Sequence, residues 1–260
     1  MSVWLFSTCT VISAGFLLFA CNPESTQPTG EPSALSSTVP AEIYVASGAG
    51  YRKPVDELKS IFESRTRIRV NCIYGNMRQV TTQVKTSGKV SVVIGDAKFL
   101  NKSGIGFTKK IQMGRGKLIL AVARNAAVEN VEDLAQSDNG RIVVPDGKKA
   151  IYGRAAAEVL KRLNIFDQVK ARLVTVQTVP QVVSYLSSGT ARIGFMNRTD
   201  FSSLDPHQFS AIEIDPSLYD PIIIEAALTR QVSAAVARYW EFIRSDEGHS
   251  VFERHGLGLQ

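Results

Sequence analysis

The amino-acid sequence predicts an α/β fold of two lobes, each built on a mainly parallel sheet, joined by a hinge that the chain crosses twice. Segments patterned as strands and helices alternate along the chain from about residue 42, as they do in parallel α/β sheets. Strand segments such as 90–94 are almost wholly apolar, which is typical of strands buried on both faces. The strands and helices form one set and then a second, and a strand near Ile222 returns the chain to the first set. This order predicts two lobes and two crossings.

The first set begins with a strand at 42–46, which enters the small-residue loop 47–50. Pro54 suits the first turn of a helix, and the helix that follows has one apolar face with helical spacing, formed by Val55, Leu58, Ile61 and Phe62. We then expect a strand at 67–74, a short helix around Val80 and Val84, and a strand at 90–94.

The second set begins with a strand at 117–122. After it we expect, in order, a short helix at 131–136, a strand at 141–144, a helix at 153–163, a strand at 172–176, a helix opened by Pro180, and strands at 192–196 and 211–214. A strand at 222–227 returns the chain, and an amphipathic helix from about Val236 breaks near Ser245 and resumes to Phe252.

The N-terminal segment is an apolar run from Val3 that ends in Leu18-Phe19-Ala20-Cys21. An apolar run that ends in small residues is typical of an export signal, and this ending resembles the lipobox of bacterial lipoproteins. That resemblance implies a signal peptide at 1–20 and lipidation of Cys21. Two alternatives remain: an uncleaved membrane-spanning helix, or an ordinary secretory signal with Cys21 incidental. No Lys or Arg precedes Arg52, so the positive charge before the run is that of the amino terminus alone.

The Pro, Ser and Thr content of 22–40 predicts a disordered tether after the cysteine, because such a segment buries too little apolar surface to offset its chain entropy. The expected organisation is a signal peptide at 1–20, lipidated Cys21 with its tether to residue 41, lobe 1 at 42–117 with 222–260, and lobe 2 at 118–221. Cys72 is predicted to be a small buried apolar residue, without an intrachain disulfide or a metal-binding cluster.

The composition limits the function classes. The chain has 260 residues and a formal net charge of +6, but its basic residues are scattered, which argues against nucleic acid as a partner and leaves an anionic small ligand or an anionic membrane surface. Enzyme motifs are lacking. The segment Met113-Gly114-Arg115-Gly116-Lys117 has Leu118 where a phosphate loop needs Ser or Thr, so we expect a turn there. Asp96, Asp146 and Asp200 follow strands and are expected to cap helices or hold hinges.

From Ile43 to Leu257 the sequence resembles the periplasmic molybdate-binding proteins of ABC importers, which have the type II solute-binding fold. The resemblance rests on the collinear order of several landmarks, none of which is decisive alone. They are Ile43-Tyr44-Val45-Ala46, Val92-Val93-Ile94-Gly95-Asp96, the crossing at 117–122, Gly140-Arg141-Ile142-Val143-Val144, the helix 155–167, Thr178-Val179, Ser188-Gly189-Thr190-Ala191-Arg192-Ile193-Gly194, Thr199-Asp200, and Arg244-Ser245-Asp246-Glu247-Gly248 through Phe252 and Gly256.

The resemblance implies an oxyanion site in the cleft, lined by hydroxyls and by backbone N–H groups at helix N-termini. The matching positions are Gly50, Met77, Tyr152, Val179 and Asn197. The family usually has hydroxyl residues at the first two and tyrosine at the last. Neighbouring Tyr51, Asn76 and Arg78 complete the expected ligand-binding set. Because two hydroxyl donors are missing, molybdate binding is expected to be weaker, by about 1.5–3 kcal/mol for each lost hydrogen bond to a charged group.

Basic residues near the expected cleft loops offer a second interpretation of the site. They are Arg52, Lys53, Arg78, Lys148, Lys149, Arg154 and Arg198, and they either pair with a different anion or are solvated charges at the rim. The resemblance thus implies a monomeric, lipid-anchored solute-binding protein, without cofactor or catalytic residues, that delivers an oxyanion such as molybdate or tungstate to an ABC permease. The alternatives are a diverged binding protein for another anion or an organic acid, and a sensor or interaction lipoprotein.

Overall fold

The computed structural model describes residues 41–136, 140–230 and 232–259. Two mixed five-stranded sheets with helices on their faces form the described part of the chain, and this confirms the predicted fold class. The predicted signal peptide, the lipidation of Cys21 and all of the tether except residue 41 fall outside the described residues.

The first sheet has the strand order β2-β1-β3-β10-β4. Its strands are β1 (Glu42–Gly48), β2 (Arg69–Gly75), β3 (Val92–Asp96), β4 (Lys109–Gly116) and β10 (Ile222–Leu228). The ladders that join β1 to β2 and β3 are parallel, and β10 is antiparallel to both β3 and β4. All strands except β10 therefore run in one direction.

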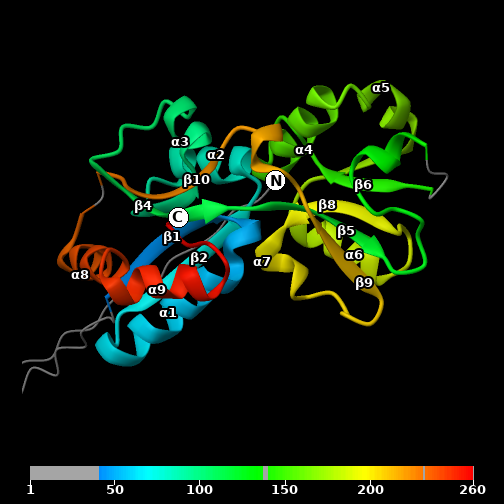
Figure 1. Ribbon diagram of the computed structural model, residues 1–260. Coiled ribbons are helices and arrows are strands. Elements are labelled where there is room, and N and C mark those ends of the chain that lie inside the picture. The colour runs from blue at the N-terminus through cyan, green and yellow to red at the C-terminus, as the bar shows by residue number, and fades with distance from the viewer. Residues whose placement is uncertain (1–40, 137–139, 231, 260) are drawn as a thin grey trace, which may run out of the picture. The chain divides into compact units, whose positions relative to one another are not determined.

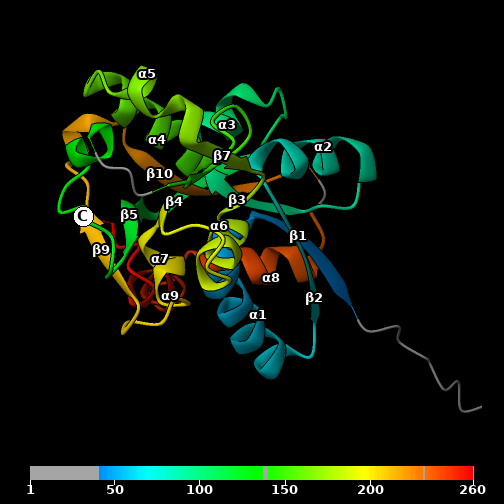
Figure 2. The ribbon, with the colours of Figure 1, turned by 90° about the vertical axis from the view of Figure 1, so that its right-hand side faces the viewer.

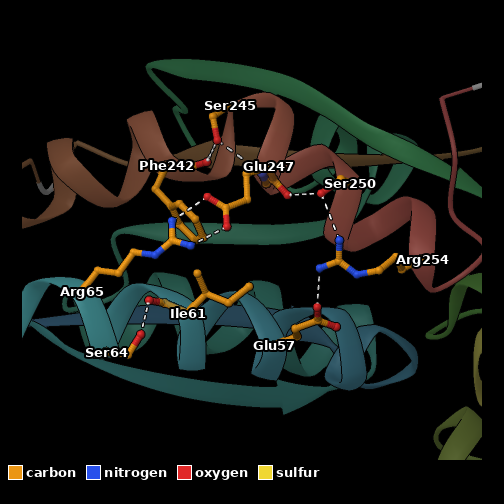
Figure 3. Close-up of polar contacts among 10 residues, drawn as sticks. Glu57, Ile61, Ser64, Arg65, Phe242, Ser245, Glu247, Ser250 and Arg254 are labelled. Carbon is orange, nitrogen blue, oxygen red and sulfur yellow. Dashed lines mark hydrogen bonds and ion pairs between the residues drawn. The ribbon is translucent and has the colours of Figure 1, made fainter.

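Figures 1 and 2 show α2 and α3 on one face of this sheet, and α1, α8 and α9 on the other. The helices are α1 (Arg52–Thr66), α2 (Met77–Ser87), α3 (Ala97–Lys102), α8 (Ala234–Ile243) and α9 (Asp246–Arg254). Two charged contacts link α1 and α9, between Arg65 and Glu247 and between Glu57 and Arg254 (Figure 3). They join the first helix of the fold to its last.

The second sheet repeats the same arrangement, with the order β7-β6-β8-β5-β9. Its strands are β5 (Leu118–Ala123), β6 (Ile142–Pro145), β7 (Leu173–Val176), β8 (Ile193–Asn197) and β9 (Phe209–Glu213). Here β5 is the strand that runs against the others. The helices around it are α4 (Ile151–Arg162), α5 (Phe166–Val169), α6 (Val179–Ser187) and α7 (Arg198–Phe201).

Two short crossings connect the sheets. The chain leaves the first sheet at the end of β4, and β5 begins two residues after Gly116; it returns through residues 214–221 between β9 and β10. A Cβ atom at Gly116 would lie 2.4 Å from the Tyr152 hydroxyl oxygen and 2.7 Å from Ile222 Cγ2. The first crossing therefore needs glycine, because any larger residue would push against both lobes.

Some elements differ from the sequence-based expectation. The turn expected at Met113 to Gly116 is the end of strand β4, which pairs with β10. The short helix expected at 131–136 is a 3₁₀ turn at Glu132–Ala135. The short helices α3 and α7 were not predicted, and the helix given as 155–167 is divided into α4, which ends at Arg162, and the short α5. Cys72 is only partly buried, and it is a free thiol whose pKa is raised mainly by burial.

Candidate functional site

A small cavity lies where four chain segments end a strand and begin a helix. Residues 48–51, 75–77, 150–152 and 178–179 line it, and its volume is about 20 Å³. The first two segments connect strands of the first sheet to α1 and α2, and the other two connect strands of the second sheet to α4 and α6. Ligands of open α/β sheets bind at such carboxyl ends of parallel strands.

The helix starts around this central cavity carry no acidic side chain of their own. No acidic residue occurs in the first turn of α1, α2, α4 or α6, or of the 3₁₀ turn Ala49–Tyr51 that precedes α1. By contrast, α9 begins with Asp246 and Glu247. Each helix N-terminus has unpaired N–H groups and about half a positive charge, so the cavity has the electrostatic character of an anion site.

The structure places most of the sequence-predicted ligand residues at this cavity. Gly50, Tyr51, Asn76, Met77, Tyr152 and Val179 line it. Arg78 lies on a neighbouring groove, and Asn197 is fully buried beside the cavity without lining it.

Tyr51 and Tyr152 bring two phenol hydroxyls together from opposite lobes. The Tyr51 hydroxyl donates to the Tyr152 hydroxyl over 3.2 Å, and both side chains are almost wholly buried. Burial raises the pKa of both phenols well above the usual value, and nearby Asp96 and Asp200 add to the shift. The hydroxyls therefore stay protonated and remain hydrogen-bond donors.

Asn197 holds the lobes together around Gly50. Its side-chain amide donates to the Gly50 carbonyl oxygen over 2.8 Å, and its Oδ1 accepts from the Asp200 backbone N–H at the start of α7. A Cβ atom at Gly50 would lie 3.1 Å from Asn197 Nδ2, so glycine permits this close approach. Its amide thus bonds protein atoms in both lobes.

Met77 fills space behind the cavity. It is 1% exposed, and a Cβ atom at Gly95 would lie 2.4 Å from its terminal methyl carbon and 2.6 Å from its sulfur. Its side chain thus packs tightly against β3. Since methionine offers no strong donor, its side chain adds no hydrogen-bond donor to the cavity.

Two buried carboxyls, Asp96 and Asp200, lie close to the tyrosine pair. Burial raises the pKa of both, and that of Asp200 reaches about 6. Asp96 accepts from the Phe99 N–H and caps α3, as its position after a strand predicted. Among the described residues, Oδ2 of each aspartate has no hydrogen-bond partner.

Further contacts tie the two lobes together near the cavity. Lys53 Nζ donates to Ser202 Oγ over 2.7 Å. Arg154, which the sequence singled out as a possible anion ligand, instead lies with Nη2 3.6 Å from Asp96 Oδ2 and with Nη1 2.8 Å from Glu158 Oε1. Its charge is therefore matched by carboxylates of the protein.

Other site types find little support in the described part of the chain. It contains no group of three or more His, Cys, Asp or Glu side chains placed to hold a metal ion. His255 pairs with Glu57, and both ring nitrogens of His249 lie 3.1 Å from backbone carbonyl oxygens. None of the described helices is both long and apolar enough to span a membrane.

Comparisons with known proteins agree with this geometry. The family model described as bacterial extracellular solute-binding protein matches residues 43–258. The molybdate-binding protein ModA of Rhodobacter capsulatus is 26% identical over 226 residues, which cover 83% of this chain and 87% of that protein.

Solved structures show the same fold. The periplasmic molybdate-binding protein of Azotobacter vinelandii superposes with a TM-score of 0.75 at 22% identity, covering 84% of this chain and 99% of that one. A structure described as the tungstate ABC transporter from Geobacter sulfurreducens has a TM-score of 0.60 at 12% identity, covering 82% and 98%.

Proposed function

Because the chain belongs to the family of bacterial extracellular solute-binding proteins, we propose that it captures a small oxyanion in the central cavity for an ABC permease. Molybdate and tungstate are the first ligands to test, since relatives of similar length and fold carry those names. Cys21 would anchor the protein by a lipid outside the cytoplasm, and the segment to residue 41 would serve as its tether.

The observation that supports this proposal most strongly is the set of acid-free helix starts around one cavity. Helix starts from both lobes without an acidic residue in the first turn point to a ligand that carries negative charge and accepts hydrogen bonds. The Tyr152 hydroxyl adds a donor that stays protonated at all physiological pH values, since the proton in its bond with Tyr51 comes from Tyr51. Binding would involve no chemical step, in keeping with relatives that are named as binding proteins.

Gly50, Met77 and Asn197 favour a second candidate within the same fold. Gly50 and Met77 have no side-chain donor. The Asn197 amide already bonds the Gly50 carbonyl oxygen and the Asp200 backbone N–H. A site with fewer donors holds a bare tetrahedral anion less tightly. A different anion or an organic acid is therefore the alternative ligand. A lipoprotein that acts as a sensor or interaction module is the alternative outside transport.

A thermal-shift panel on the full chain tests the proposal. Molybdate, tungstate, sulfate, phosphate and small carboxylates are compared, because a ligand that binds only the folded state stabilises it by about 2.7 kcal/mol at 100 times its Kd. A rise in melting temperature with molybdate or tungstate supports those ions as the ligand. A rise with another anion alone supports the alternative ligand, a different anion or an organic acid. No shift with any of them favours the interaction module.

Val179→Pro tests the role of the helix N-termini directly. Proline is tolerated at the first position of a helix, and the extended backbone of Thr178, with φ −144° and ψ 159°, accepts a following proline. The change removes one N–H donor, so anion affinity should fall about tenfold to a hundredfold. Val179→Ala keeps that N–H and is the matched control. Equal affinities in the two variants would contradict the role of α6.

Labelling with a fatty-acid analogue tests the anchor separately. The label should enter the wild-type chain and be lost in Cys21→Ser. Labelling that persists in the variant would exclude Cys21 as the lipid site.

A further inference from the structure

The central cavity is too small to enclose a whole ligand as it stands. Its volume of about 20 Å³ is little more than the roughly 10–15 Å³ that one water molecule needs. A groove of about 540 Å³ lies next to it. The two share Gly75 and Asn76 as lining residues, so the groove begins where the cavity ends.

This groove, named here the Arg78 groove, has a lining of positive and amide groups. Besides Arg78 and Lys149, its lining includes Thr82, Gln83 and Gln177 together with apolar residues such as Ile73 and Val80, and none of the described residues that line it is acidic. Lys149 Nζ lies 3.2 Å from Asp146 Oδ2, so part of its charge is already matched. Arg78 forms no ion pair within the described residues. Its exposed guanidinium is therefore available to a ligand.

Two weak contacts join residues that line the Arg78 groove, one of them through Asn76, which also lines the cavity. Asn76 Nδ2 donates to Gln177 Oε1 over 3.3 Å, and the Arg78 backbone N–H donates to the Lys149 carbonyl oxygen over 3.4 Å. Both distances are long for hydrogen bonds. Gln177 is exposed, so its side chain can turn to water at little cost when a ligand takes its place.

We propose that the ligand is an organic oxyanion of the class of small phosphate monoesters, with its charged group at the helix starts and its substituent in the Arg78 groove. Hydroxyl or carboxylate oxygens on the substituent match the donors of Arg78, Gln83 and Thr82. The inference rests on the proposed function, because the charged group must first bind in the central cavity. It accounts for a site with few side-chain hydroxyls, since Arg78 supplies contacts that a bare anion does not make.

Calorimetric titration of the full chain tests the proposal. The probes are inorganic phosphate, sulfate and molybdate, and beside them glycerol 3-phosphate and 2-phosphoglycolate. We expect a phosphate ester to bind at least about tenfold more tightly than any of the inorganic anions, as one added hydrogen bond to a charged group allows. Arg78→Ala should remove that advantage and change inorganic anion affinity less than about threefold. Arg238→Ala removes an exposed charge on α8, outside the groove, and should change neither affinity.

The possible outcomes separate the two proposals. Ester preference that depends on Arg78 supports the organic ligand. Inorganic anions that bind as tightly as the esters, or an ester affinity unchanged in Arg78→Ala, overturn it and leave the oxyanion function intact. Absence of binding by every probe, with both wild type and Arg238→Ala folded, overturns both.

Discussion

Asp200 is expected to destabilise the folded protein at neutral pH. It is 6% exposed, and burial raises its pKa from 3.8 to about 6, although Lys53 and the Asn197 hydrogen bond act in the opposite direction. The shift is about 2 pKa units, and each unit corresponds to about 1.36 kcal/mol. An ionised Asp200 therefore costs the fold about 3 kcal/mol above pH 6.

The sign of the pH dependence follows from the raised pKa. Between about pH 4 and pH 6 the folded protein binds a proton at Asp200 while the unfolded chain does not. This contribution to the free energy of unfolding is therefore complete below pH 4 and is lost as the pH rises through 6. Asp200→Asn should raise the melting temperature at pH 8 by about 6–12 °C, at about 2–4 °C per kcal/mol for a domain of this size. The gain should fade toward pH 4.

Thermal unfolding of wild type and Asp200→Asn from pH 4 to pH 8 measures this. The difference in melting temperature between the two proteins isolates the contribution of Asp200 from that of other carboxyls, several of which have lowered rather than raised pKa values. Asp205→Asn is the control, because the His207 backbone N–H lowers the pKa of the exposed Asp205 carboxyl. That variant should lose stability at pH 8. A destabilised Asp200→Asn, or a difference from wild type that is constant with pH, would refute the reasoning.

Three further substitutions test other parts of the fold. Gly116→Ala should lower the free energy of unfolding in urea by about 1–3 kcal/mol and weaken anion binding, because its Cβ would collide with Tyr152 and Ile222. Gly258→Ala is the control and should leave stability unchanged, because no atom lies within 4 Å of the added carbon. Equal losses of stability in the two variants would contradict the steric argument. Ser245→Ala should cost about 1 kcal/mol, because its hydroxyl accepts from the Gly248 N–H at the start of α9 (Figure 3). Arg65→Ala should leave the melting temperature almost unchanged, because its pair with Glu247 is largely exposed. A larger loss in Arg65→Ala than in Ser245→Ala would reverse this ranking.

The two-lobed fold was predictable because its central strands have an unambiguous pattern. Every residue of β3, β5 and β8 is buried, and such strands appear in the sequence as uninterrupted apolar runs. Strand β4 was missed because Lys109–Gly116 is an edge strand with several polar residues and pairs only with β10. A pattern built on apolar runs does not find a strand in which charged and polar residues interrupt the apolar ones.

The central cavity was partly predictable for a related reason. A loop after a strand and before a helix places its residues at the carboxyl edge of a sheet, so the order of elements located the loops, and the family resemblance selected Gly50, Tyr152 and Val179 within them. The bonding state of Asn197 could not be predicted, because its partner Gly50 is 147 residues away in the chain. Nor did the sequence indicate that Arg154 faces Asp96. The local sequence predicts the element or loop that carries a side chain, whereas tertiary packing determines which groups that side chain contacts.

This distinction changes the meaning of the missing hydroxyls. In sequence, Gly50 looks like a lost ligand contact and Asn197 like a replaced one; in the structure the Asn197 amide donates to the Gly50 carbonyl oxygen, and a Cβ atom at residue 50 would lie only 3.1 Å from that amide nitrogen. The pair therefore exchanges ligand contacts for a hydrogen bond between the lobes. Such a bond stabilises the arrangement in which the helix starts face one another, with or without a ligand. A ligand then pays less to draw the lobes together, and the side-chain donors that it lacks in the central cavity are the reason to look for further contacts at Arg78.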